Sequence, residues 1–428
     1  MPGITIGKFT VEADEDTSPE GRLACWLNAE SSAFHLPRRP PEDLPALAAS
    51  FRADARMLVG AYDAEQRPHA WDARVPVATY GTMAKNLNVG SGTMLSAHLI
   101  TDVTVRPTHR RRGLLRKLIT ADLADAAANG FPVAALTVSE ATIYGRFGFG
   151  CATSTHRIEV DVSAGFRLDA PAAGRTVLAA PEKVIELSET VFSSFHQVRR
   201  GSVDRTYPYP RRASGEWGLE RPVEDSSVRT AVHYDDDGTA TGYVSYAFRG
   251  WDTQPATMRI VDLVAVTSSA YLELWRFLGS LDLVQRISWD SAAVDDPLPW
   301  ALHDRRRYRV TGVDDVLWLR LLDVPAAFSA LQYRSDGVLT VRVADQLGLA
   351  GGTYRLTVAE GRAEVGVLPS DAVADLELDV STLASVYLGA ASAAGLARAG
   401  RIGGPVEASK TLDELLGDRA APYCISRF

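Results

Sequence analysis

One segment near residue 100 constrains the fold more than any other part of the chain. Residues 95–105 (LSAHLITDVTV) alternate in the manner of a β-strand that ends at Pro107. An amphipathic helix follows over about residues 112–129, and Asn129-Gly130 is a good stop signal. Its apolar stripe consists of Leu114, Leu115, Leu118, Ile119, Leu123 and Ala126. A strand, a tight turn and a helix in this order indicate a mixed α/β domain.

The same interpretation extends over the N-terminal third of the chain. Apolar spacing predicts two helices, over residues 21–33 and 42–52, and three further strands, over residues 57–62, 75–89 and 133–138. After the last of these strands, Ser139 can cap a short helix that runs through Tyr144.

The length of 428 residues predicts about three domains. We expect them at residues 1–156, 157–300 and 301–428. The second block repeats the order of strand, strand, strand and helix, which makes it a candidate duplicate of the first. The third block contains four predicted strands, at residues 316–321, 337–343, 352–358 and 374–380. It ends in an apolar tail, residues 421–428, of the kind that usually docks.

Charge and composition exclude several classes of protein. The net charge of −8 disfavours a general nucleic-acid binder. No stretch approaches the ~20 apolar residues of a membrane span, and the N-terminus shows no secretory signal. Cys25, Cys151 and Cys424 are too far apart for a disulfide framework or a metal knuckle. We therefore expect a cytoplasmic, metal-free protein without a nucleic-acid partner.

The loop before the predicted helix carries the strongest chemical signal. A helix start offers unpaired N–H groups and a positive dipole end, and Gly113 removes a side chain where a phosphate would approach. We interpret the loop as a pyrophosphate cradle; the alternative is a solvated basic helix start. The basic side chains around it are Arg106, His109, Arg110, Arg111, Arg112, Arg116 and Lys117.

These motifs resemble those of a known family. Arg110-Arg-Arg-Gly113-Leu-Leu115 is similar to the acyl-CoA loop of GNAT acetyltransferases, except that Leu115 replaces Gly or Ala. The longer runs RPTHRRRGLLRKL and PVAALTVSEATIYGRFGFG resemble the Eis family of N-acetyltransferases. Further similar runs are DPLPWALHD, LWLRLLDVPAA, SVYLGA and the terminal Phe428.

The resemblance implies an α/β (α+β) protein with tandem GNAT-like domains on mixed sheets and a C-terminal sterol-carrier-protein-like domain. It implies acetyl-CoA as the donor, a small-molecule amine as the acceptor (aminoglycosides in the best-known members) and a homohexamer. Polyamines, arylalkylamines or peptide lysines are alternative acceptors. A lipid-binding protein with a vestigial GNAT domain is the alternative of a different class.

The resemblance also implies roles for single residues. Tyr144 is the expected general acid, and the terminal carboxylate of Phe428 is the expected general base. A core tyrosine and a docked hydrophobic tail are the alternatives that the residues alone leave open. The backbone of Val103 and Val105 is expected to hold acetyl-pantetheine. The remaining donor-binding residues are expected to be Arg110, Arg111, Gly113, Leu114 and Ser139.

The expected acceptor pocket departs from the family pattern. The stretch after the first helix, residues 31–40, contains His35 and two arginines where the family has an acid. Asp102 stands near the position of a family aromatic. It either supplies the missing negative charge or is a polar residue at a sheet edge.

Overall fold

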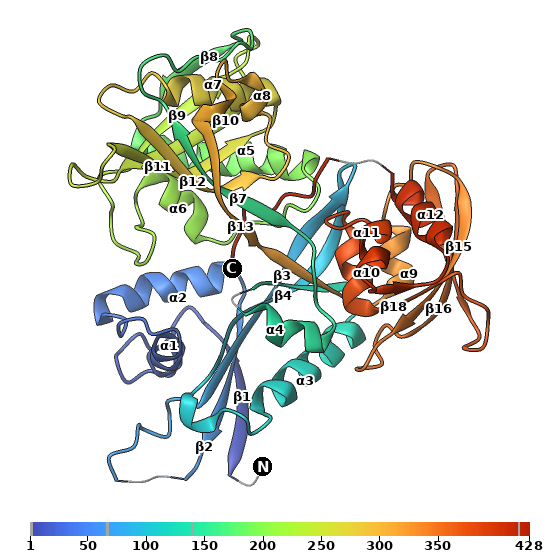
Figure 1. The fold of residues 1–428 in the computed structure, drawn as a ribbon. Helices are drawn as coiled ribbons and strands as arrows, with labels where there is room; N and C mark the ends of the chain where they lie inside the picture. The colour runs from blue at the N-terminus through green and yellow to red at the C-terminus, as the bar shows by residue number, and fades with distance from the viewer. Residues whose placement is uncertain (1–2, 66–67, 139, 418–419) are drawn as a thin grey trace.

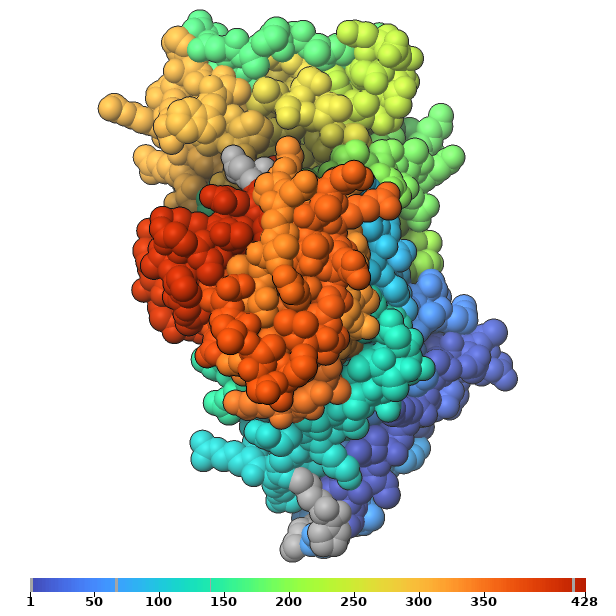
Figure 2. Space-filling view, turned by 90° about the vertical axis from the view of Figure 1, so that its right-hand side faces the viewer, coloured from blue at the N-terminus to red at the C-terminus, as the bar shows by residue number. Residues whose placement is uncertain are grey.

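The computed structural model describes residues 3–65, 68–138, 140–417 and 420–428. Within these residues the chain forms three mixed sheets, two of seven strands and one of five, with helices packed on them (Figure 1). The predicted α/β class with mixed sheets is thereby confirmed. Figure 1 shows the second domain above the first and the third domain beside them, so that in Figure 2 the third domain (orange to red) faces the viewer.

The first sheet carries helices on both faces. Leu58 packs in one buried cluster with α1 (Arg22–Ala33) and α2 (Leu44–Ala53), whereas its neighbour Val59 packs with α3 (Leu114–Ala128) and α4 (Ala141–Tyr144). Because side chains alternate along a strand, the two helix pairs cover opposite faces. The strand order is β1 (Ile4–Thr10), β2 (Met57–Asp63), β3 (Ala78–Gly90), β4 (Thr93–Val105), β5 (Val133–Thr137), β14 (Leu317–Leu321) and β6 (Gly150–Cys151).

Helix α3 matches its prediction to within two residues. It begins after Gly113, whose φ of +75° an L side chain rarely adopts, and it stops at Asn129 before Gly130. The side chains it buries are five members of the predicted stripe: Leu114, Leu118, Ile119, Leu123 and Ala126.

The second sheet repeats the architecture of the first. In both, two parallel strands are joined through a helix: β4 and β5 through α3, and β11 and β12 through α7 (Ser268–Leu278). The sequence Asp235-Asp-Asp-Gly238 predicts a hairpin turn, and these residues join β9 to β10. The strand order is β13 (Tyr308–Asp315), β7 (Ser154–Asp161), β12 (Arg286–Ala293), β11 (Thr257–Ala265), β10 (Ala240–Phe248), β9 (Arg229–Tyr234) and β8 (Arg175–Leu178); the other helices are α5 (Val184–Val198), α6 (Pro208–Ser214) and α8 (Leu298–Ala301).

The third sheet has five strands and a parallel pair at its centre, β15 with β18. The strand order is β17 (Arg362–Leu368), β16 (Gly352–Ala359), β15 (Gly337–Ala344), β18 (Leu376–Asp379) and β19 (Ile402–Gly403). Its helices are α9 (Val324–Ser329), α10 (Val380–Tyr387), α11 (Ala393–Arg398) and α12 (Val406–Leu416).

One predicted strand lies in a different sheet from the one expected. Residues 316–321 were assigned to the third domain, but β14 pairs with β5 from Leu317–Thr137 to Leu321–Val133 in the first sheet. An apolar strand of this kind fits any buried sheet position, so its pattern does not reveal its partner. Similarly, β13 pairs with β7 in the second sheet. The domain boundaries at residues 156 and 300 remain predictions.

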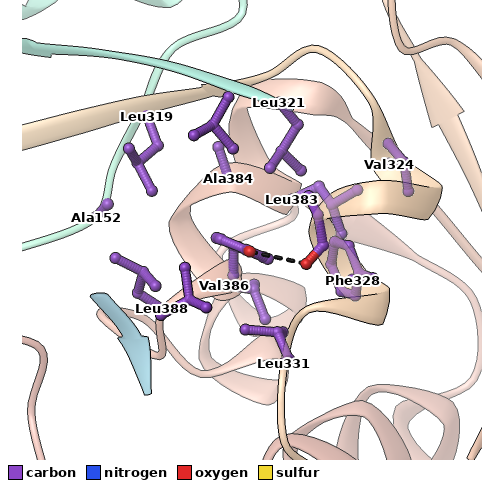
Figure 3. Close-up of a cluster of buried hydrophobic side chains, with 14 of the residues drawn as sticks. Ala152, Leu319, Leu321, Val324, Phe328, Leu331, Leu383, Ala384, Val386 and Leu388 are labelled. Atoms are coloured by element: carbon purple, nitrogen blue, oxygen red, sulfur yellow. Dashed lines mark hydrogen bonds between the residues drawn. The ribbon is translucent and has the colours of Figure 1, made fainter. Parts of the chain in front are cut away.

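Strand β14 also ties the first sheet to the third domain. Leu319 and Leu321 share a buried cluster with Leu383 and Ala384 of α10 (Figure 3). From the same strand, the fully buried Arg320 donates to Asp345 at 2.6 Å. Removing one partner of such a buried ion pair leaves the other charge uncompensated at a cost of about 3–5 kcal/mol. The pair therefore fixes the third domain against the sheet.

Candidate active site

The central feature of the first sheet is a gap between β4 and β5. These strands pair in parallel from Ala97–Val133 to Ile100–Leu136, and the described residues form no pair beyond that point. Asp102 has a φ of +53°, and the register between β3 and β4 shifts between Thr79 and Gly81. A bulge of this kind re-aims a strand. The end of β4 therefore leaves β5 and exposes an edge of its backbone.

Two valines of β4 present their backbone to this gap. The N–H of Arg106 donates to the carbonyl of Val77 at 2.8 Å, on the β3 side. Because backbone groups alternate along a strand, the N–H groups of Val103 and Val105 point to the other side. The Val105 carbonyl accepts a hydrogen bond from Arg110 Nε at 3.3 Å. The gap thus offers backbone donors and acceptors to a ligand.

The loop after β4 exposes positive charge at the start of α3. Arg111 has a φ of +61°, and Gly113 caps the helix without a side-chain hydrogen bond. The first hydrogen bond of the helix runs from the N–H of Lys117 to the carbonyl of Gly113, at 3.0 Å. The N–H groups of residues 114–116 therefore have no helical acceptor. Arg110 and Arg111 are exposed and form no ion pair within the described ranges.

The cationic loop is anchored at both ends. His109 Nε2 lies 3.0 Å from Asp63 Oδ2 at the end of β2, and this hydrogen bond lowers the pKa of the Asp63 carboxyl. On the helix side, the Leu114 side chain is 3% exposed and packs in the sheet core. The backbone of the loop is therefore held in place while its arginine side chains stay in solvent.

Tyr144 is the last residue of α4, which follows β5 along the chain. It is buried, and its ring packs edge-on against Phe149 at 6.2 Å between centroids. Burial and the nearby charge of Glu140 raise the pKa of Tyr144 to about 12. Val103 and Val105 pack at the border of the same cluster. The phenol is therefore protonated at neutral pH, and its ring belongs to the apolar cluster against which both valines of the gap pack.

The C-terminal tail docks against the second domain before it reaches the first, as the apolar composition predicted. Tyr423 donates from its hydroxyl to the Ser291 carbonyl, and its N–H donates to the Arg200 carbonyl at 2.9 Å. Ser426 donates to the Val203 carbonyl at 2.8 Å, and Tyr209 Oη bonds the backbone of Arg427. These contacts fix the path of the last residues.

The final residue reaches the strand gap. Thr137 closes β5 one position beyond the last β4–β5 pair. Its hydroxyl donates at 2.6 Å to a terminal carboxylate oxygen of Phe428, whose N–H lies 3.3 Å from the same hydroxyl. The terminal carboxylate therefore lies at the gap, on the same sheet as the backbone of Val105.

A cavity of about 340 Å³ opens beside Phe428, between the first and second domains. Glu30 and Asp102 both line it, and burial together with Asp102 raises the pKa of Glu30 to about 7. Asp102 also forms an ion pair with Arg56 at 3.1 Å. Asp102 is thus a cavity residue whose charge is already matched, rather than an unpaired substitute for the missing acid.

The structure brings together most residues singled out in the sequence. Val103, Val105 and Phe428 lie at the gap, and Arg110, Arg111, Gly113 and Leu114 form the helix start that follows β4. Tyr144 belongs to the apolar cluster against which Val103 and Val105 pack. Ser139 lies outside the described residues. The sequence did not predict Thr137 or Glu30, because isolated residues that meet only through the fold leave no spacing pattern. Within the described part of the chain, no cluster of potential metal ligands and no helix able to cross a membrane occurs.

The acetyltransferase (GNAT) domain family matches residues 20–152 and, through a second family model, residues 201–321. The sterol carrier protein domain family matches residues 324–425. The class is therefore an N-acetyltransferase with tandem GNAT domains, and the suspected duplication is confirmed.

Full-length relatives narrow this class. The chain is 35% identical to an uncharacterized N-acetyltransferase of Streptomyces avermitilis, over 97% of this chain and 99% of that protein. It is 36% identical to the N-acetyltransferase Eis of Mycobacterium tuberculosis, over 75% of this chain and 77% of that protein. The crystal structure of Eis1 from Mycobacterium abscessus matches with a TM-score of 0.72 and 30% identity, over 87% of this chain and 90% of that one. The chain belongs to the Eis family of GNAT N-acetyltransferases.

The contact between Thr137 and the terminal carboxylate predicts a measurable local effect. We expect Thr137→Val to free the last residue, because a hydrogen bond to a charged group contributes about 1.5–3 kcal/mol. Carboxypeptidase A should then release Phe428 at least about tenfold faster than from the unmodified protein. Thr120→Val, on the exposed face of α3, is the matched control. Equal release rates in all three proteins would contradict the contact.

Proposed function

We propose that this protein transfers an acetyl group directly from acetyl-CoA to an amine, with both substrates bound at once. The main support is that a terminal carboxylate and a cationic helix start meet at one strand gap. Burial raises the pKa of the thiols of Cys25, Cys151 and Cys424, which disfavours a thiolate nucleophile and an acetylated enzyme intermediate.

The donor binds along the gap. The free N–H groups at the start of α3 and the side chains of Arg110 and Arg111 hold the pyrophosphate, because a helix start favours anions. The backbone of Val103 and Val105 pairs with the pantetheine arm in place of the missing β5 partner. The N–H of Val105 then stabilises the oxyanion that forms on the thioester carbonyl.

Tyr144 assists departure of the thiolate. The amine lone pair attacks the thioester carbon, the C–S bond breaks, and the sulfur takes a proton. A phenol with a pKa near 12 donates a strong hydrogen bond to a thiolate, whose ordinary pKa is about 8.5. Full proton transfer from such a phenol is unfavourable by about 5 kcal/mol at ~1.4 kcal/mol per pKa unit. Hydrogen bonding to the developing charge is therefore its main contribution, and the proton follows later.

The terminal carboxylate of Phe428 handles the acceptor proton. An alkylammonium has a pKa of about 10, whereas a terminal carboxyl has one of about 3.5, so direct deprotonation is strongly uphill. Pairing of the ammonium with the carboxylate orients the nitrogen, and water relays the proton away. Aminoglycosides are the acceptors expected from the family resemblance; polyamines, arylalkylamines and peptide lysines are alternatives for the same chemistry. On that resemblance we also propose a cytoplasmic homohexamer.

The donor site can be tested by comparing acetyl-CoA with acetyl-pantetheine, a shorter donor. We expect Arg110→Ala and Arg111→Ala each to raise the KM for acetyl-CoA about tenfold, the loss of one charge-assisted contact to phosphate. Acetyl-pantetheine lacks the pyrophosphate, so its kcat/KM should stay within about twofold. Arg52→Ala, an exposed arginine of α2, is the control. An equal loss with both donors would remove these arginines from pyrophosphate binding.

The role of Tyr144 can be tested by removing its hydroxyl. We expect Tyr144→Phe to lower kcat about 100-fold while the KM values for both substrates stay within about threefold. Because the pKa is about 12, the rate of the unmodified enzyme should show no loss from this phenol as pH rises to about 10. Tyr62→Phe, on β2, is the control. A change confined to KM would exclude the acid role.

A further inference from the structure

The cavity beside Phe428 is lined from both domains and by the tail. Trp26, Glu30 and Asp102 come from the first domain, while α6 of the second domain contributes Arg212. Figure 1 shows α6 on the side of the second domain that faces α2. The volume of the cavity, about 340 Å³, lies near the lower end of the ~300–1,000 Å³ range of small-molecule sites. The cavity therefore suits an acceptor of modest size.

Most charges in the cavity already have partners. Arg56 pairs with Asp102 at 3.1 Å, and Arg39 lies 3.9 Å from Glu30. A third arginine of the lining, Arg221, binds Asp43 at 2.8 Å. Apart from the exposed Glu220 and the terminal carboxylate of Phe428, the described carboxylates that line the cavity are therefore already matched by arginines.

Arg212 is different. Its side chain forms no hydrogen bond or ion pair among the described residues, and its Nε is buried without a partner. Burial, together with the charge of Arg56, lowers the pKa of this guanidinium. A buried unpaired charge is costly, and the planar fork of a guanidinium matches a carboxylate. Of the two lining arginines without an ion pair among the described residues, Arg427 is exposed and Arg212 is partly buried. Arg212 is therefore the cation of the cavity best placed to take its counter-charge from a ligand.

We propose that the acceptor carries a carboxylate as well as the amine that is acetylated, and that Arg212 binds this carboxylate. The inference rests on the proposed transfer of acetyl to an amine in this cavity. In such a complex the ammonium faces the terminal carboxylate of Phe428, and the acceptor carboxylate faces α6. Free amino acids and short peptides have this chemistry, whereas aminoglycosides and polyamines do not.

Matched acceptor pairs test the proposal. Phenylalanine is compared with phenethylamine, lysine with cadaverine, and glycyl-phenylalanine with glycyl-phenethylamine. We expect kcat/KM to favour the carboxylate-bearing member at least about tenfold in at least one pair. Arg212→Gln should lower its kcat/KM about 10- to 100-fold and change that of the matching amine less than about threefold. Arg211→Gln removes a neighbouring charge on α6, outside the cavity, and should leave the selectivity unchanged.

Other outcomes overturn the proposal. A preference for the decarboxylated amine in every pair, or transfer only to aminoglycosides and polyamines, contradicts it while the proposed function stands. If Arg212→Gln lowers kcat/KM equally for both acceptors of a pair, Arg212 supports the fold or positions Phe428 and does not bind the acceptor carboxylate. If no amine is acetylated, the proposed function fails. Calorimetric titration with N-acetyl-phenylalanine then tests separately whether Arg212 binds a carboxylate. Binding weakened about tenfold in Arg212→Gln supports the site, and absent or unchanged binding overturns it.

Discussion

The loss of pairing between β4 and β5 is the constraint on which the site depends. The bulge at Asp102 turns the end of β4 while β3 continues to pair with it, so one edge of a central strand has no neighbour. Backbone groups inside a sheet are normally satisfied, and an unpaired edge here requires a ligand, water or another segment. The sheet thereby creates a slot whose depth and direction are set by backbone rather than by mobile side chains.

The position of the last residues at this slot depends on contacts with the other domains. A terminus is usually poorly ordered, and fixing its last residues costs conformational entropy. Here Tyr423, Cys424 and Ile425 are buried, and hydrogen bonds to Ser291, Val203 and Tyr209 hold the backbone. The second domain thus acts as a support for the tail, and β14 joins the third domain to the sheet that the tail must reach.

The parts predicted from sequence were those encoded by local patterns. The stripe and stop signal of α3, the glycine before it and the hairpin at residues 235–238 depend on neighbours in the chain. The position of β14 and the pairs Thr137–Phe428 and Arg56–Asp102 depend on residues 46 to 291 positions apart. Such long-range contacts follow from the topology of the fold, which short sequence patterns do not specify. The unpaired state of Arg212 is visible only once all its neighbours are placed.

We propose that the charge of the Phe428 carboxylate takes part in acyl transfer. Expressed protein ligation can replace the terminal carboxylate with a carboxamide while every side chain stays the same, and the ligated carboxylate form is the reference. We expect turnover at saturating substrates to fall about 100-fold while acetyl-CoA binds with unchanged Kd, because the proposed role of this carboxylate is toward the amine and not toward the donor. Turnover within about twofold of the reference would contradict it.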